Sequence, residues 1–358
     1  MATVTGVPAT RTVPSSSVAE RSLAILAIGA ALAFCYVVRE LLAPSVVALV
    51  LAFTVHPLVA WLERRRVPHF VAALAGTLLA TAAVALVFVV LYGRMQDLAG
   101  ELPSYQDRLR QAWDGITRSV LHLRAQTQQF APPHQPGTVQ IEENLPWTTL
   151  ALGTAHGALT LVGATAVAVF VLYFSLAEGP RFRTKFLAHA GRDPNARARA
   201  VAALDELHRD VSQYMWNRIL LNAALGVVTW LCYAFWLAHP AVWGLTTALL
   251  HFIPYVGPAV GFVFPVLMAL LQYGDVAHVL LAGGIYLLLV SIQGNVVDPL
   301  FLGKQLRLSP FVVFVGSLFF FWLWGPLGLF VAVPVLSTVR IACKYVPRLA
   351  VVADFLAA

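Results

Sequence analysis

The chain has 358 residues, of which 59% are apolar and only 11% are charged, and its mean hydropathy is +0.77. A soluble domain carries about 25% charged residues, so this composition excludes an ordinary soluble fold and favours a protein embedded in lipid. The net charge of +7 does not indicate nucleic-acid binding, because the basic residues lie in short clusters between apolar runs, which is how membrane topology is encoded.

Six apolar segments have the length of a membrane span. A helix needs about 20 apolar residues to cross about 30 Å of hydrocarbon. The segments that meet this requirement are 22–38, 41–62, 69–92, 150–177, 218–238 and 276–296. The first ends in Arg39-Glu40 without a small-residue cleavage site, so we interpret it as a retained span and not as a signal peptide.

Two longer apolar stretches, 241–272 and 309–341, contain proline and glycine near their middle. A single helix over either stretch would be roughly 48–50 Å long at 1.5 Å per residue, which exceeds the thickness of the membrane. Proline removes a backbone donor and clashes with the preceding turn. The predicted fold is therefore all-α: a polytopic integral membrane protein with about six full transmembrane helices and two Pro/Gly-broken, hairpin-like segments.

The distribution of Lys and Arg predicts the orientation of the chain. With two re-entrant hairpins, 18 of the 24 basic residues and both termini lie in the cytoplasm; if both stretches crossed the membrane, 16 would. The prediction begins with a cytoplasmic tail (1–20), three spans (21–92), an extracytoplasmic helical segment (93–147) and a fourth span (148–177). A cytoplasmic amphipathic segment (178–217), a membrane core with both hairpins (218–346) and a cytoplasmic tail (347–358) follow.

The two polar segments between spans show the periodicity of helices. Apolar residues from Leu98 to Leu123 recur at steps of three and four, which predicts an amphipathic helix that packs on the protein or on another subunit. Asp193-Pro194 predicts the start of a second helix, with Asp as cap and Pro in the first turn. Its basic residues are able to bind lipid headgroups, but retention of the segment in the cytoplasm is the expected role.

No enzyme signature is present in the sequence. There is no P-loop, no GxSxG and no HExxH motif, and the ten histidines are scattered singly. The cysteines lie in or beside apolar runs without metal-binding spacing; they are Cys35, Cys232 and Cys343. We therefore expect no catalytic residue, no metal and no cofactor.

Polar residues interrupt the last of the six spans near its inner end. Gln293, Asn295 and Asp298 lie close together and are followed by Pro299. Polar side chains inside membrane spans cost free energy and are usually functional, although amides also hold helices together. Broken helices at membrane depth are tolerated where they line a cavity or are buried, and transporters bind polar substrates at such points.

The chain resembles the autoinducer-2 exporter (AI-2E) family of bacterial membrane proteins over roughly residues 20–345. The central motif is Ile253-Pro-Tyr-Val-Gly-Pro258. The other matching positions are Tyr173-Phe174, Glu178-Gly179, Gly294-Asn295, Pro299, Gly303-Lys304, Ser309-Pro310, Gly325, Gly328 and Ala332-Val-Pro334. The resemblance implies homo-oligomeric inner-membrane transporters, of which some export a furanone-type signal and others resemble cation/proton antiporters.

Two departures from the family pattern bear on function. Many relatives have Glu where this chain has Gln293, which does not titrate, so that Asp298 is the remaining candidate for proton coupling. Many relatives also have a Gly-Gly pair where this chain has Phe320-Phe321-Trp322, which would narrow or reshape a pathway.

We therefore predict a multi-pass transporter of the bacterial inner membrane that exports a small solute, with a quorum-signal-like molecule as one candidate, by using an ion gradient. The alternatives are a sodium or lithium/proton antiporter with Asp298 as carrier, and a membrane scaffold or regulator that transports nothing. The expected partners are membrane lipid, the solute or ion, and further copies of the chain. The predicted translocation residues are Pro254, Tyr255, Gly257, Pro258, Gln293, Asn295, Asp298, Pro299, Gly325 and Gly328.

Overall fold

The computed structural model describes residues 18–101, 147–189, 194–301, 308–346 and 350–357, and side chains of 18–21, 24, 28 and 147–159 are not included. These residues form helices joined by short turns, which confirms the all-α prediction. The first five helices are α1 Val18–Val37, α2 Arg39–Arg64, α3 His69–Glu101, α5 Trp147–His189 and α6 Pro194–Tyr233. The others are α7 Pro240–Leu250, α8 Val256–Tyr273, α9 Val276–Ile292, the π-helical turn η3 Gln293–Val297, α10 Asp298–Phe301, α11 Pro310–Trp324, α12 Pro326–Tyr345 and α13 Ala350–Leu356.

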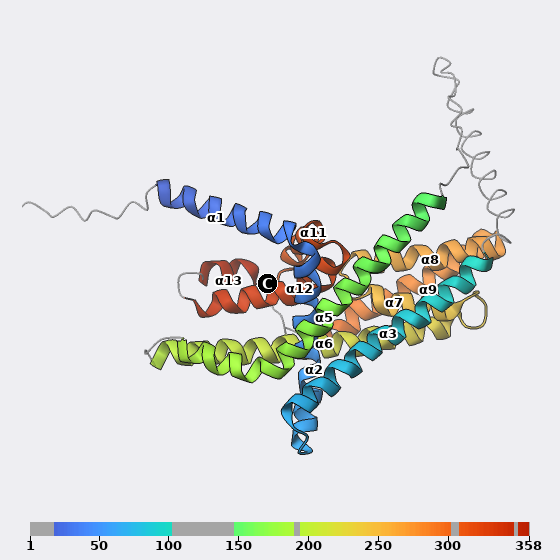
Figure 1. Cartoon of the computed structure of the whole chain (residues 1–358). Coiled ribbons are helices and arrows are strands. Elements are labelled where there is room, and N and C mark those ends of the chain that lie inside the picture. Colours follow the sequence, from blue (N-terminus) through green and yellow to red (C-terminus); the bar gives the residue numbers. More distant parts are fainter. Residues whose placement is uncertain (1–17, 102–146, 190–193, 302–307, 347–349, 358) are drawn as a thin grey trace, which may run out of the picture.

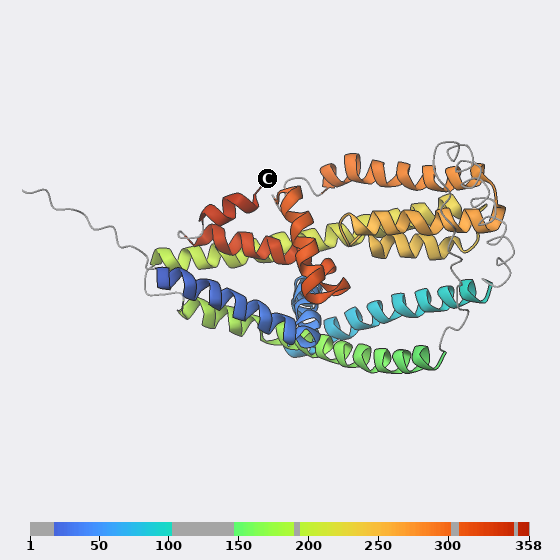
Figure 2. The same cartoon turned by 90° about the horizontal axis from the view of Figure 1, so that it is seen from above.

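The molecule is elongated, and the two long helices α5 and α6 run along its length (Figures 1 and 2). Helices α3, α7, α8 and α9 lie around one end, and α1, α12 and α13 lie around the other. Helix α2 crosses the long axis near the middle of the molecule. The outer predicted helix around Leu98–Leu123 falls mostly outside the described residues.

Seven of the described helices are long and apolar enough to cross a membrane. They are α2, α3, α8 and α12, most of α5, all of α6, and the continuous stretch Val276–Phe301. Large apolar side chains such as Leu79 and Phe88 are 57% and 61% exposed on these helices, as expected where lipid replaces water. Helices α7 and α11 have 11 and 15 residues, so each predicted hairpin combines one short helix with one of spanning length.

Local sequence signals set where these helices begin and end. Pro240, Pro310 and Pro326 occupy first turns, where the missing N–H has no partner to lose. Asp275 caps α9 by accepting a hydrogen bond from the backbone N–H of His278 at 2.9 Å, and this bond lowers the pKa of Asp275. Gly274 ends α8 with a φ of +73°, a conformation that glycine adopts without steric cost.

Both predicted breaks are present in the structure. The first lies between α7 and α8, where Tyr255 has a φ of +62°. A Cβ on Gly257 would lie 1.9 Å from the carbonyl oxygen of Leu250, so the returning chain touches the end of α7. The second lies at Gly325, whose φ is +66°, between α11 and α12.

Small and branched side chains form the core where α2 crosses the other helices. One cluster joins α2, α3 and α5 through residues that include Ala48, Ala72, Ala73 and Leu176. A second joins α2, α6 and α12. At this crossing the indole N–H of Trp216 donates to the carbonyl oxygen of Thr54 at 2.9 Å, which ties α2 to the middle of α6.

Candidate functional site

A cavity of about 360 Å³ lies beside the midpoint of α6. Its walls come from α6, the turn between α7 and α8, the end of α9 with η3 and α10, the start of α11, and α12. The cavity therefore lies where the first broken segment meets the polar break at 293–299. Among the side chains that line it are Tyr214, Arg218, His251, Tyr255, Gln293 and Asp298.

An ion pair between Arg218 and Asp298 forms part of the wall of this cavity. The Nη1 of Arg218 lies 3.2 Å from Oδ2 of Asp298, and the two side chains are 20% and 23% exposed. The Nε of Arg218 also donates to the hydroxyl oxygen of Tyr214 at 3.4 Å, a long hydrogen bond. Since α6 and α10 are 80 residues apart in sequence at this contact, the pair connects two separate parts of the membrane core.

Several buried polar atoms around the cavity have no hydrogen-bond partner among the described residues. They are Oδ1 of Asp298, Oε1 of Gln293, Nδ2 of Asn222 and Nε2 of His251. The other amide atoms of Asn222 and Gln293 contact each other at 3.4 Å. Buried polar groups are normally satisfied, so this mixture of donors and acceptors suits a hydrated, polar occupant.

The turn between α7 and α8 contributes one wall of the cavity. Pro254, Tyr255 and Pro258 line it, and the Tyr255 hydroxyl donates to the carbonyl oxygen of Pro310 at 3.2 Å. This hydrogen bond joins the first broken segment to the start of the second one.

The π turn η3 orients the polar break. The backbone N–H of Asp298 donates to the carbonyl oxygen of Gln293, five residues earlier, so one extra residue is accommodated in the helix. Gln293 and Asp298 consequently both face the cavity, whereas Asn295 is exposed and donates to the carbonyl oxygen of Ser291 at 3.0 Å. π turns of this kind occur frequently at functional sites.

The structure brings together half of the predicted translocation residues. Pro254, Tyr255, Pro258, Gln293 and Asp298 line the cavity. The others lie beside it or in the second break, without lining it: Gly257, Asn295, Pro299, Gly325 and Gly328. Of the second break's glycines, Gly328 packs against the backbone of α11, since a Cβ there would lie 1.9 Å from the carbonyl oxygen of Phe320.

Sequence reasoning missed Arg218, which it assigned to the cytoplasmic basic residues. The structure shows Arg218 in contact with Asp298, 80 residues further along the chain. The available signal was the spacing of Tyr214, Arg218 and Asn222, which recur every four residues on the same helix. That spacing places polar side chains on one face of a helix.

The comparison with known proteins agrees with this architecture. The sequence model of the AI-2E family transporter matches residues 23–348. The AI-2 transport protein TqsA of Escherichia coli is 28% identical over 313 residues, covering 85% of this chain and 86% of that protein. A relative from Haemophilus influenzae, whose name gives transport but no substrate, is 28% identical over 336 residues, covering 92% and 93%. The chain therefore belongs to the AI-2E transporter family, and its function is membrane transport.

Proposed function

We propose that this protein is a secondary transporter of the inner membrane that exports a small polar solute through the central cavity by using an ion gradient. Family membership and the seven apolar helices support transport across a membrane. The name of one relative, the AI-2 transport protein TqsA, makes a quorum-signal molecule one candidate solute. We further propose that both termini are cytoplasmic and that the protein assembles as a homo-oligomer.

The observation that carries this proposal is the Arg218–Asp298 pair inside the cavity. Charged groups at membrane depth cost free energy unless they are paired or hydrated, and a buried pair often contributes less to stability than apolar packing would. A purely structural role therefore does not explain why both charges face a cavity. A pair joined through one nitrogen and one oxygen at 3.2 Å is easily opened by a proton on Asp298 or by a polar solute that takes its place.

The two broken segments supply the surrounding geometry for alternating access. The beginning of α7 lies near the end of α3, where His239 is 3.0 Å from Glu101. The end of α12 lies near the beginning of α6, where Lys344 is 2.8 Å from Glu206. The segments therefore reach the cavity region from opposite ends of the molecule (Figure 1), an arrangement that resembles the paired broken helices of many transporters.

A sodium or lithium/proton antiporter is the second candidate. Its support is the pair of buried acceptor atoms without a partner among the described residues, Oδ1 of Asp298 and Oε1 of Gln293, since hard cations prefer oxygen ligands. Everted vesicles with a pH-sensitive dye distinguish the candidates. A pH response that depends on sodium or lithium and disappears in Asp298→Asn supports the antiporter, whereas no such response supports solute export alone.

The export proposal is tested first in cells. Metabolites inside and outside cells that produce the wild-type chain are compared with those of cells that produce Asp298→Asn. We expect one solute to accumulate outside only with the wild type, and its flux in liposomes to fall at least tenfold in Asp298→Asn at equal protein amounts. The matched control is Asp97→Asn, which breaks an exposed ion pair with Arg94 on α3. Equal metabolite profiles and equal flux in the two variants would contradict the assignment of the cavity as the transport site.

A further inference from the structure

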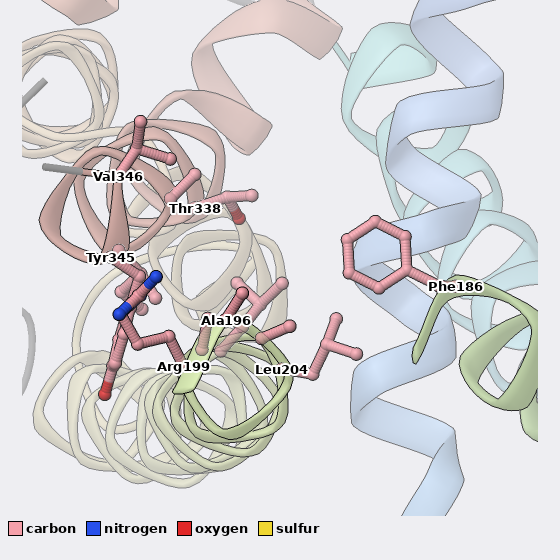
Figure 3. Close-up of a pocket in the computed structure, with 12 residues that line it drawn as sticks. Phe186, Ala196, Arg199, Leu204, Thr338, Tyr345 and Val346 are labelled. Atoms are coloured by element: carbon pink, nitrogen blue, oxygen red, sulfur yellow. The ribbon is translucent and has the colours of Figure 1, made fainter. Parts of the chain in front are cut away.

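A second cavity, separate from the central one, lies toward the end of the molecule where α12 and α13 are found. It has a volume of about 370 Å³ and lies between the end of α5, the first turns of α6 and the last turns of α12. Figure 3 shows Phe186 on one side, facing side chains of α6 and α12 on the other, with Arg199 beside Tyr345. This volume lies within the range of about 300–1,000 Å³ typical of ligand sites.

Most side chains that line the cavity are apolar, and small ones repeat on one face of α6. Ala196, Ala200 and Ala203 line it at steps of four and three residues, which places them on a single helix face. Ile341 and Ala342 of α12 lie opposite. An apolar space of this size gains free energy when hydrocarbon fills it in place of water.

The charges around the opening favour an anion. Arg199 lines the cavity, is exposed, and has no ion-pair partner within the described part of the chain. The nearby acidic side chains are already engaged: both carboxylate oxygens of Glu206 lie 2.8 Å from Nζ of Lys344, and Asp205 lies 2.7 Å from Arg183. A positive charge is thus left at the rim of an apolar space.

Exposed apolar side chains also lie at this end of the molecule. Helix α1 lies at the same end as the cavity (Figures 1 and 2), and its apolar side chains are exposed, with Leu23, Ile25 and Leu26 at 68–71%. Apolar helix surfaces of this kind require hydrocarbon around them. Acyl chains are therefore the available material to fill the neighbouring cavity.

From these observations we propose that the cavity between α5, α6 and α12 binds an anionic phospholipid, with an acyl chain against the alanine face and the phosphate at Arg199. The headgroup provides the anion that Arg199 lacks, and the chain provides the apolar volume. Since Arg199 and Arg218 lie on the same continuous helix α6, this lipid contacts the element that also carries the central ion pair. The site itself does not depend on which solute is transported.

Native mass spectrometry of the full chain in neutral detergent tests this proposal. Dioleoyl-phosphatidylglycerol and dioleoyl-phosphatidylcholine are added in turn, and the affinity of each adduct is measured. We expect the wild type to retain phosphatidylglycerol preferentially. Arg199→Gln should lose about fivefold in affinity, the typical contribution of one basic residue at an anionic lipid surface, and should no longer prefer phosphatidylglycerol.

Ala200→Trp fills the cavity and should abolish retention of both lipids, and Ala203→Leu is the milder second variant if the Trp variant does not fold. Arg94→Gln, at the other end of the molecule, is the matched control and should bind as the wild type does. The proposal is overturned if Arg199→Gln and the filled variants retain phosphatidylglycerol normally, or if the wild type does not prefer phosphatidylglycerol to phosphatidylcholine. It is also overturned if millimolar inorganic phosphate displaces the adduct, because the site would then recognise phosphate without an acyl chain.

Discussion

The Arg218–Asp298 pair gives the sharpest prediction on stability. Asp298→Asn removes one charge and leaves the guanidinium of Arg218 beside a neutral amide. Arg218→Gln does the reverse and leaves the carboxylate alone. The double variant, in which neither charge remains, should therefore be destabilised by less than the sum of the two single variants.

The geometry sets the size of the effect. At 3.2 Å and an effective dielectric constant of about 20, the Coulomb attraction is roughly 5 kcal/mol before desolvation. Loss of one partner from a fully buried pair costs about 3–5 kcal/mol, whereas exposed pairs contribute about 0–1 kcal/mol. With both side chains about one-fifth exposed, we expect each single variant to lose about 2–3 kcal/mol, with a coupling energy of about 1.5 kcal/mol between them.

A double-mutant cycle in mixed micelles measures this coupling, with unfolding by SDS followed by tryptophan fluorescence. The pair of Arg94 and Asp97 is the control cycle, because these side chains are 57% and 59% exposed at 3.7 Å, and its coupling should be about 0.5 kcal/mol or less. If the effects of Asp298→Asn and Arg218→Gln simply add, the two charges do not interact in the folded protein and the reasoning is refuted.

Two further predictions concern the first broken segment and the topology. Gly257→Leu should stop transport and destabilise the fold by about 1–3 kcal/mol, because a Cβ would lie 1.9 Å from the carbonyl oxygen of Leu250; flux in liposomes measures this, with Gly284→Leu, which has open space around its Cβ, as control. Normal flux in Gly257→Leu would show that the turn is only a kink. In a cysteine-free background, an impermeant thiol reagent should label Gly100→Cys in intact cells and Asn195→Cys only after lysis; the opposite pattern would reverse the proposed orientation.

The sequence was sufficient to predict where the two apolar stretches break, but not how long the helices on either side of each break are. The Pro and Gly residues around Tyr255 and Gly325 act locally on the backbone, so their effect is readable from the chain itself. Two other prolines, Pro265 and Pro334, lie inside continuous helices, where proline is tolerated in membrane helices when neighbouring groups take over the freed hydrogen bonds. Composition alone therefore did not show that α8 and α12 each have spanning length.

The residues of the candidate site could also be predicted only in part. Asp298 and Gln293 were identified because they stand out as polar within an apolar run. Arg218 stands at the edge of a basic segment, where its charge looks like a topology signal, and its partner is 80 residues away. Asn295 was grouped with Asp298 because the two are close in sequence. The π turn, which makes their side chains point in different directions, could not be predicted from the spacing of an ordinary α-helix.

Because the π turn at Gln293–Val297 contains one extra residue, that residue determines the direction in which the side chains of the following helix point. In an α-helix each residue rotates the chain by about 100°, so if the same residues were wound as a regular α-helix, Asp298, five residues after Gln293, would point about 140° away from it. The carboxylate would then leave the face occupied by Gln293, although no residue of the cavity had been substituted. Any rearrangement that moves the wide turn along the helix would have the same effect reversibly, so that the direction of Asp298 is set by the winding of the backbone as well as by its own side chain.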